Sequence, residues 1–147
     1  MQGDKMNLGA TDEMILKAEA EMNLRFPEGL KQVLKISNGL ELPGGWKLHP
    51  VFDPNEPRKT CSHIGYENTK GRWSYMDSKL IGIASGDTGN QLVLESDGSQ
   101  LADTILFWDH ETNKTKKWGK GFEYLIEKAK TRIDKINKQI SRSIKTR

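Results

Sequence analysis

The part of the chain between residues 79 and 119 constrains the fold most, because four short strand-like runs follow one another there. The runs are KLIGIAS, NQLVLES, TILFWD and TKKWG, each rich in β-branched or aromatic residues. They are separated by GDTG, DGSQLA and HETN, whose Gly, Asp and Asn residues favour chain reversal. The pattern therefore predicts an antiparallel meander of about four strands.

The first of these reversals lies in IASGDTGNQLVLESDG, residues 83–98, which could be a ligand-binding loop or a hairpin turn. A phosphate-binding loop needs Gly-Lys-Ser/Thr, whereas Gly89 is followed by Asn90. A calcium loop needs acids at alternate positions, and Asp87 stands nearly alone. Apolar residues alternate on both sides of the turn, so we predict a β-hairpin.

Two helices are predicted ahead of these strands. Thr11 can cap a helix over TDEMILKAEAEMN, and Pro27 suits the first turn of a second helix in FPEGLKQVLKISNG. Residues 41–79 are richer in Pro, Gly and polar side chains. We expect one short strand around Trp46–Phe52 and irregular chain after it.

The C-terminal residues combine an apolar stripe with positive charge. Apolar residues recur there at steps of three and four, at Phe122, Ile126, Ala129, Ile133, Ile136, Ile140 and Ile144. This spacing predicts a helix of about six turns. Residues 128–147 hold eight Lys and Arg against one acid, whereas the other 127 residues hold 15 against 19.

We therefore divide the chain into a domain over residues 1–128 and a basic amphipathic helical extension over residues 129–147. Three roles remain open for the extension. It could dock on the domain, associate with a second copy as a homodimer, or bind nucleic acid or an anionic membrane surface.

Composition limits the class of protein. A chain of 147 residues is long enough for one domain with a sizeable core. The single cysteine, Cys61, excludes an internal disulfide framework and fits a reducing compartment. The sequence has no signal-peptide pattern and no run of 18 apolar residues, so we expect a cytoplasmic protein without a transmembrane segment.

Residues that could support catalysis are few. His110 lies between two carboxylates in WDHE, and Cys61 lies two positions before His63, but nothing marks an oxyanion hole or an orienting acid. We therefore expect no catalytic residue, no metal and no cofactor.

Tryptophan and tyrosine in irregular regions are candidates for partner contact, since rigid amphipathic rings anchor interfaces. Trp108 and Trp118 are expected to pack within the domain. The residues predicted to face a partner are Trp46, Glu67, Trp73, Tyr75, Asp77, Asp87 and His110.

Three stretches in this order are similar to one known family. They are LRFPEGLKQVLKISNGLELPGG, IGIASGDTGNQLVLESDG and TILFWDHETNKTKKWGKGFEYL. Over about residues 10–128 the chain resembles the SUKH superfamily, the Smi/Knr-type immunity domains. The resemblance implies an α+β fold: a twisted antiparallel sheet of four to six strands, flanked here by N-terminal helices and the long C-terminal helix.

The resemblance also implies a function without enzymatic activity. Bacterial members bind and neutralise a toxin domain, often a nuclease, and fungal relatives are regulatory scaffolds. We therefore expect an immunity protein that acts by stoichiometric binding. The alternative is a regulatory or nucleic-acid-associated scaffold that acts through the basic C-terminal helix.

Overall fold

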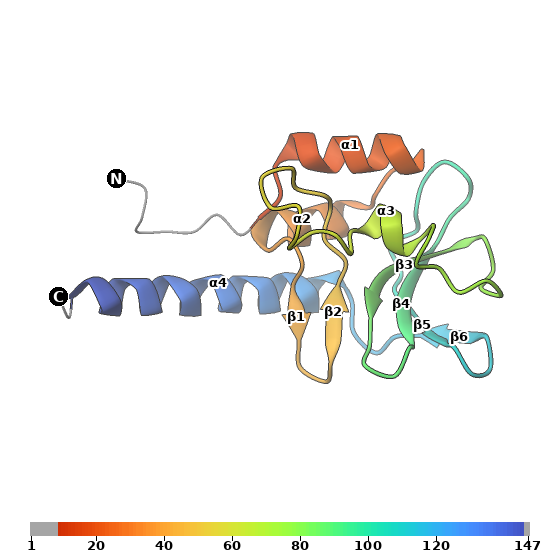
Figure 1. Cartoon of the computed structure of the whole chain (residues 1–147). Coiled ribbons are helices and arrows are strands. Elements are labelled where there is room, and N and C mark those ends of the chain that lie inside the picture. The colour runs from red at the N-terminus through yellow and green to blue at the C-terminus, as the bar shows by residue number, and fades with distance from the viewer. Residues whose placement is uncertain (1–8, 146–147) are drawn as a thin grey trace.

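In residues 9–145, which the computed structural model describes, six strands form one antiparallel sheet in the order β1-β2-β3-β4-β5-β6 (Figure 1). The strands are β1 (Glu41–Leu42), β2 (Trp46–Leu48), β3 (Leu80–Ser85), β4 (Gln91–Glu95), β5 (Leu106–Asp109) and β6 (Lys114–Lys117). Each strand pairs with the next one along the chain, so the sheet is a meander. The predicted α+β class is confirmed, and the sheet extends the predicted four-stranded meander by β1 and β2.

Four helices accompany the sheet in the described residues: α1 (Asp12–Met22), α2 (Glu28–Ile36), α3 (Ile64–Glu67) and α4 (Phe122–Lys145). Helix α2 lies between α1 and α4 (Figure 1). Helix α1 begins as predicted, because the Thr11 hydroxyl accepts a hydrogen bond from the Met14 backbone N–H at 3.2 Å. It ends at Asn23, whose left-handed φ of 55° turns the chain toward α2.

The sheet carries an apolar core on each face. Leu92 and Leu94 of β4 belong to the larger core, together with buried residues of α1, α2 and α4. Val93, between them, points to the other face and packs with Met76 and Trp108 in a smaller core. This alternation follows from the two-residue period of a strand. Helices therefore cover one face, and the segment before β3 covers the other near β4 and β5.

The predicted hairpin at residues 83–98 is the β3–β4 pair. Its strands pair from Leu80 opposite Glu95 to Ser85 opposite Gln91, and Gly89 in the turn has a φ of +95°. That φ favours glycine because a Cβ would clash with the backbone. The structure thus supports the turn interpretation of this stretch.

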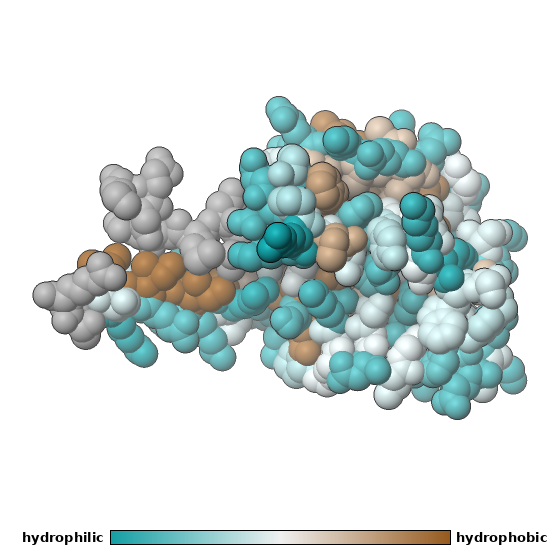
Figure 2. Space-filling view, viewed as in Figure 1, coloured by the Kyte–Doolittle hydropathy of each residue, from teal (hydrophilic) through white to brown (hydrophobic). Residues whose placement is uncertain are grey.

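Helix α4 runs unbroken from the domain into the C-terminal residues. Leu125 and Ala129 are fully buried against the domain, and the Arg132 guanidinium donates to the Ser37 hydroxyl at 3.2 Å. Beyond Arg132 the helix projects away from the body (Figure 1), and its apolar residues form a stripe on one side (Figure 2). The predicted helix is confirmed, and a functional division at residue 128 stays a prediction.

Gly29 lets α2 approach α4 closely. A Cβ placed on Gly29 would lie 2.6 Å from the Cβ of Phe122, which no ordinary side-chain contact allows. The first turn of α4 therefore packs directly on the backbone of α2 at Gly29. This contact fixes where α4 leaves the domain.

Candidate partner-binding surface

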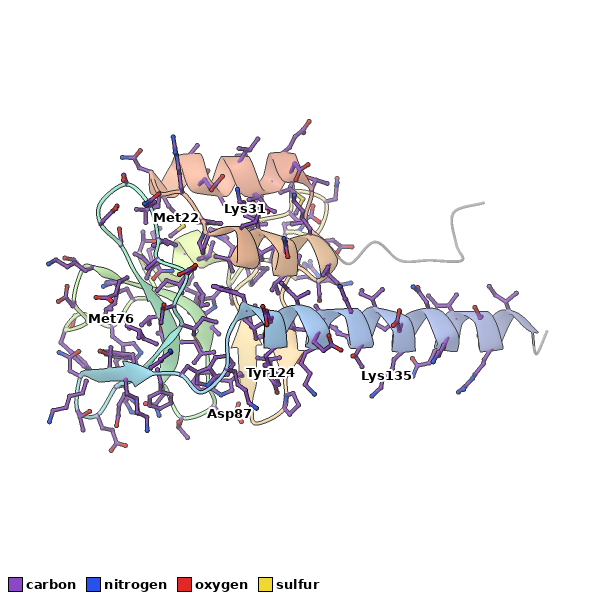
Figure 3. The ribbon with its side chains drawn as sticks, turned by 180° about the vertical axis from the view of Figure 1, so that it is seen from behind. Met22, Lys31, Met76, Asp87, Tyr124 and Lys135 are labelled. Atoms are coloured by element: carbon purple, nitrogen blue, oxygen red, sulfur yellow. The ribbon has the colours of Figure 1, made fainter. Side chains whose placement is uncertain are left out.

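Three turns lie at one end of the sheet, which we call the turn end. They are residues 43–45 between β1 and β2, 86–90 between β3 and β4, and 110–113 between β5 and β6. A meander sends alternate turns to the same end, so segments far apart in the sequence meet there. Figure 3 labels Asp87, which lies in the middle turn.

Four aromatic side chains, Trp73, Tyr75, Trp108 and His110, form a cluster at this end. The Trp73 ring stacks on His110 with centroids 5.2 Å apart, and the Tyr75 ring lies 5.8 Å from that of Trp108. Trp108 is fully buried beneath the cluster, whereas Tyr75 is 46% exposed. The aromatic cluster thus has a buried base and an accessible outer edge.

Two asparagines hold the aromatic cluster in place. The Asn90 side-chain oxygen accepts from the His110 backbone N–H at 3.0 Å and lies 2.7 Å from His110 Nδ1. The Asn113 side-chain oxygen accepts from Trp108 Nε1 at 2.8 Å, and its amide donates to the Tyr75 carbonyl at 3.2 Å. These bonds tie the β3–β4 turn, the β5–β6 turn and the segment before β3 into one rigid unit.

Arg72 organises the segment that carries Trp73 and Tyr75. Its guanidinium donates to the backbone carbonyls of Leu80 at 2.8 Å, Met76 at 3.3 Å and Asp77. Burial lowers the pKa of Arg72 below its ordinary value, and the Asp77 charge opposes that shift. The Asp77 carboxylate itself accepts from the Lys79 backbone N–H at 2.9 Å, so it shapes a turn beside the aromatic cluster.

Trp46 and Asp87 lie on the other side of the β3–β4 turn. The Trp46 ring meets the Phe107 ring edge-on at 6.0 Å, and a Cβ on Gly86 would lie 3.2 Å from Trp46. Asp87 is next to Gly45 in the β1–β2 turn. Gly89, which lies in the β3–β4 turn with Asp87, faces Trp73. The β3–β4 turn therefore contacts the aromatic cluster on one side and Trp46 on the other.

Glu67 does not belong to the aromatic cluster. It is on α3 and lines a cavity of about 170 Å³ together with Lys47, His49 and Ser85. Burial raises the pKa of the Glu67 carboxyl above its ordinary value. Ser85, which directly precedes the β3–β4 turn, lines the same cavity, and the other six predicted residues lie at the turn end or in the segment before β3.

His49, beside Glu67, makes the stability of the fold depend on pH. The His49 side chain is 6% exposed and its Nε2 lies 3.4 Å from the Ser85 hydroxyl. Burial, reinforced by the charge of Lys47, lowers the pKa of His49 to about 4. An unfolded histidine titrates near 6.5, so between the two pKa values the unfolded chain binds a proton that the folded chain does not.

We expect the His49 contribution to reduce the free energy of unfolding as pH falls from about 6.5 to about 4, by about 3 kcal/mol in total. Urea unfolding at several pH values would measure this for the native chain and for His49→Gln. The difference in the free energy of unfolding between the native chain and His49→Gln should become smaller at low pH. Parallel curves for both proteins would contradict the assignment.

The turn end carries charges of both signs. Glu111 is exposed in the β5–β6 turn and Asp87 in the β3–β4 turn, while Lys114, Lys116 and Lys117 are exposed on β6. An uninterrupted acidic face, which would mimic a phosphate backbone, is not formed there. This mixed pattern fits the surface of a protein partner better than a nucleic acid.

The sequence analysis missed Asn90, Asn113 and Arg72, which build the aromatic cluster without belonging to it. Both asparagines lie in turns, where Asn already has a local explanation as a turn residue. Among the described residues, no group of three or more metal-ligating side chains is close enough to hold an ion, and Cys61 is exposed. No described helix has the length and apolar composition to cross a membrane.

The fold and this surface define an α+β domain with a rigid aromatic face at the turn end of a meander. The chain belongs to the SMI1 / KNR4 family (SUKH-1), whose model matches residues 9–128. This family is known for immunity-type domains that are generally non-catalytic. No curated protein matches the chain.

Proposed function

We propose that this protein is a cytoplasmic immunity protein that binds a toxin domain stoichiometrically and blocks its active site or substrate groove. Family membership supports the class of activity, and the aromatic cluster supports the place of contact. Inhibition of this kind needs a complementary surface and no catalytic group. Formation of the complex by itself protects the cell from the toxin.

The observation that carries the proposal is that hydrogen bonds within the chain hold the aromatic cluster in place. Asn90 and Asn113 fix its rings from two turns, and Tyr75 presents its edge to solvent. Association then costs little side-chain entropy, which is the condition under which Trp and Tyr become binding hot spots. A nuclease is the toxin class that the family resemblance of the sequence suggests.

Tyr75→Ala is expected to weaken toxin binding about 30-fold or more, the effect of removing a typical hot-spot residue. Tyr66→Ala is the matched control, because Tyr66 is a similarly exposed tyrosine, at 42% against 46%, that lies on α3 away from the turn end. The measurement is capture by tagged protein from its native cells, with mass spectrometry of stoichiometric partners.

The expected partner is a protein with a toxin domain, retained by the native chain and by Tyr66→Ala and lost with Tyr75→Ala. Co-expression of that toxin domain should then kill cells unless the native chain is present. If Tyr75→Ala and Tyr66→Ala retain the partner equally well, the partner binds somewhere other than the turn end. Failure of the native chain to protect cells from its captured partner would overturn the immunity proposal itself.

A further inference from the structure

Helix α4 carries a row of positive charges that the aromatic cluster does not use. Counted from Tyr124 at about 100° per residue, Lys128, Lys135 and Arg142 lie within about 40° of one line along the helix. Lys138 lies about 40° to the other side of that line. At 1.5 Å per residue the row is about 27 Å long. We call this row the basic face.

The ring of Tyr124 brings a further cation into the basic face. The ammonium group of Lys120, just before α4, lies 4.9 Å from the centre of the Tyr124 ring, and that of Lys128 lies 5.4 Å from it. Neither lysine forms a salt bridge in the described part of the chain, where the ion pairs involve α1 and α2 only. Two like charges are thus held at one ring without a carboxylate to neutralise them, which favours an anion at this place.

Negative charges flank the basic face on one side only. Glu123, Glu127 and Asp134 lie about 60–100° around the helix from its central line, all in the same direction. Arg132 lies about 80° from the line in the opposite direction. Residues 120–142 hold seven Lys and Arg against these three acids. A polyanion is therefore attracted to the basic face itself and to its Arg132 side.

The shape of the molecule disfavours a flat anionic partner such as a bilayer. The isoleucines of the projecting segment lie about 120–200° from the basic face, on the opposite side of the helix. Figure 2 shows this apolar stripe on the upper side of α4, and Figure 3 shows Lys135 on the lower side. The body extends beyond α4 on both sides, upward at α1 and downward at the turn between β1 and β2 (Figure 1). A bilayer laid against either side would meet the body before it reached the helix.

The composition of the basic face also differs from that of a protein interface. Lysine is depleted where proteins bind proteins, and the centre of such an interface is apolar or aromatic. Lys135, Lys138 and Arg142 are exposed, and the position between Lys128 and Lys135 on the same line is Thr131, which is also polar. Nucleic acids are bound in the opposite way, by rows of Lys and Arg that follow the repeated phosphates.

We propose that the basic face binds single-stranded nucleic acid through its phosphate backbone. A flexible strand can follow a straight row of cations beside the body, which a flat bilayer cannot do. Two lysines already lie over the Tyr124 ring, so the contact is with phosphates and does not read the base sequence. RNA and DNA share this backbone and should bind alike. The proposal does not rest on toxin binding.

Fluorescence anisotropy of labelled oligonucleotides, titrated with the full chain, measures this binding. The probes are oligouridylate and oligothymidylate of about 20 nucleotides, at salt concentrations from about 50 to about 300 mM. We expect micromolar dissociation constants at the lowest salt, within about threefold of each other. For about five phosphate contacts, the logarithm of the association constant should fall against the logarithm of the salt concentration with a slope of about −3.5. Absence of binding at the lowest salt would refute the proposal.

Lys135→Glu with Lys138→Glu should weaken binding about 30-fold or more and reduce the slope by about 1.4, since two phosphate contacts are lost. Both side chains are exposed and lie beyond the last hydrogen bond of α4 to the domain, so the melting temperature should not change. The matched control is Arg58→Glu with Lys59→Glu, which changes the net charge equally in the exposed chain between β2 and α3. The control should bind like the native chain. Equal loss in both variants would show that net charge, and no particular face, attracts the strand.

Two further probes test the other anionic partners. They are a labelled glutamate peptide of about 20 residues and vesicles that contain phosphatidylserine. We expect both to bind at least about tenfold more weakly than the oligonucleotides. A peptide that binds as tightly would show that any acidic chain suffices and would overturn the assignment to nucleic acid. Binding to vesicles without binding to oligonucleotides would assign the basic face to a membrane instead, and a preference above about tenfold for RNA or DNA would contradict a contact made through phosphates.

Discussion

Trp108→Ala should lower the free energy of unfolding by about 4 kcal/mol, the largest single effect we expect. Trp108 is fully buried, packs with Met76 and Val93 in the smaller core, and donates its indole N–H to Asn113. Truncation removes the support beneath Trp73 and leaves the Asn113 oxygen without its partner. The aromatic cluster should loosen together with the segment that covers this face of the sheet.

Urea unfolding measures the stability loss, and limited proteolysis of residues 71–79 reports on the loosened segment. Trp118→Ala is the control for tryptophan removal as such, because Trp118 is only partly buried and should cost less than half as much. Trp108→Phe keeps most of the ring volume and isolates the lost hydrogen bond, at about 1–2 kcal/mol. Equal losses for the two alanine variants would show that the smaller core contributes little.

Gly29→Val should cost about 3 kcal/mol, at the upper end for overpacking a close contact. The new Cβ would lie 2.6 Å from the Cβ of Phe122, and the backbone of either α2 or α4 must move to relieve the clash. Because this contact sets the direction of α4, the variant should also disturb the hydrogen bond between Arg132 and Ser37.

Gly119→Val is the matched control, because a Cβ at Gly119 meets no atom within 4 Å although it lies just before α4. We expect Gly119→Val to change the free energy of unfolding by less than about 0.5 kcal/mol. Thermal unfolding of both variants, with circular dichroism of the helical signal, separates the two outcomes. A Gly29→Val protein as stable as the native chain would mean that α2 and α4 can separate without loss.

The strands and helices with strong local patterns were predictable from the sequence. The β3–β4 hairpin follows from alternation around a glycine-containing turn, and α4 follows from isoleucines at helical spacing. Strand β1 was not predicted, because two residues are too few to show an alternating pattern in the sequence. It is recognisable as a strand only from its pairing with β2. Helix α3 is four residues long and escaped prediction for the same reason.

The candidate site could be predicted only as separate residues. Trp73, Tyr75 and His110 stand out because aromatic side chains in irregular regions favour partner contact. Their assembly depends on the topology that brings two turns to one end and on Asn90 and Asn113, which bond across it. Glu67 was predicted together with them, and the structure places it on α3, where it lines a cavity with Lys47, His49 and Ser85.

The sequence by itself determined the fold class, the family resemblance and the amphipathic character of α4, since these depend on short-range periodicity and turn chemistry. Only the tertiary structure decided which side chains meet at the turn end, which asparagines form hydrogen bonds to the aromatic cluster, and where α4 leaves the domain. The physical reason is that those outcomes depend on contacts between residues distant in the chain. Gly29 against Phe122 is one such contact, and its close approach leaves no periodic trace in the sequence.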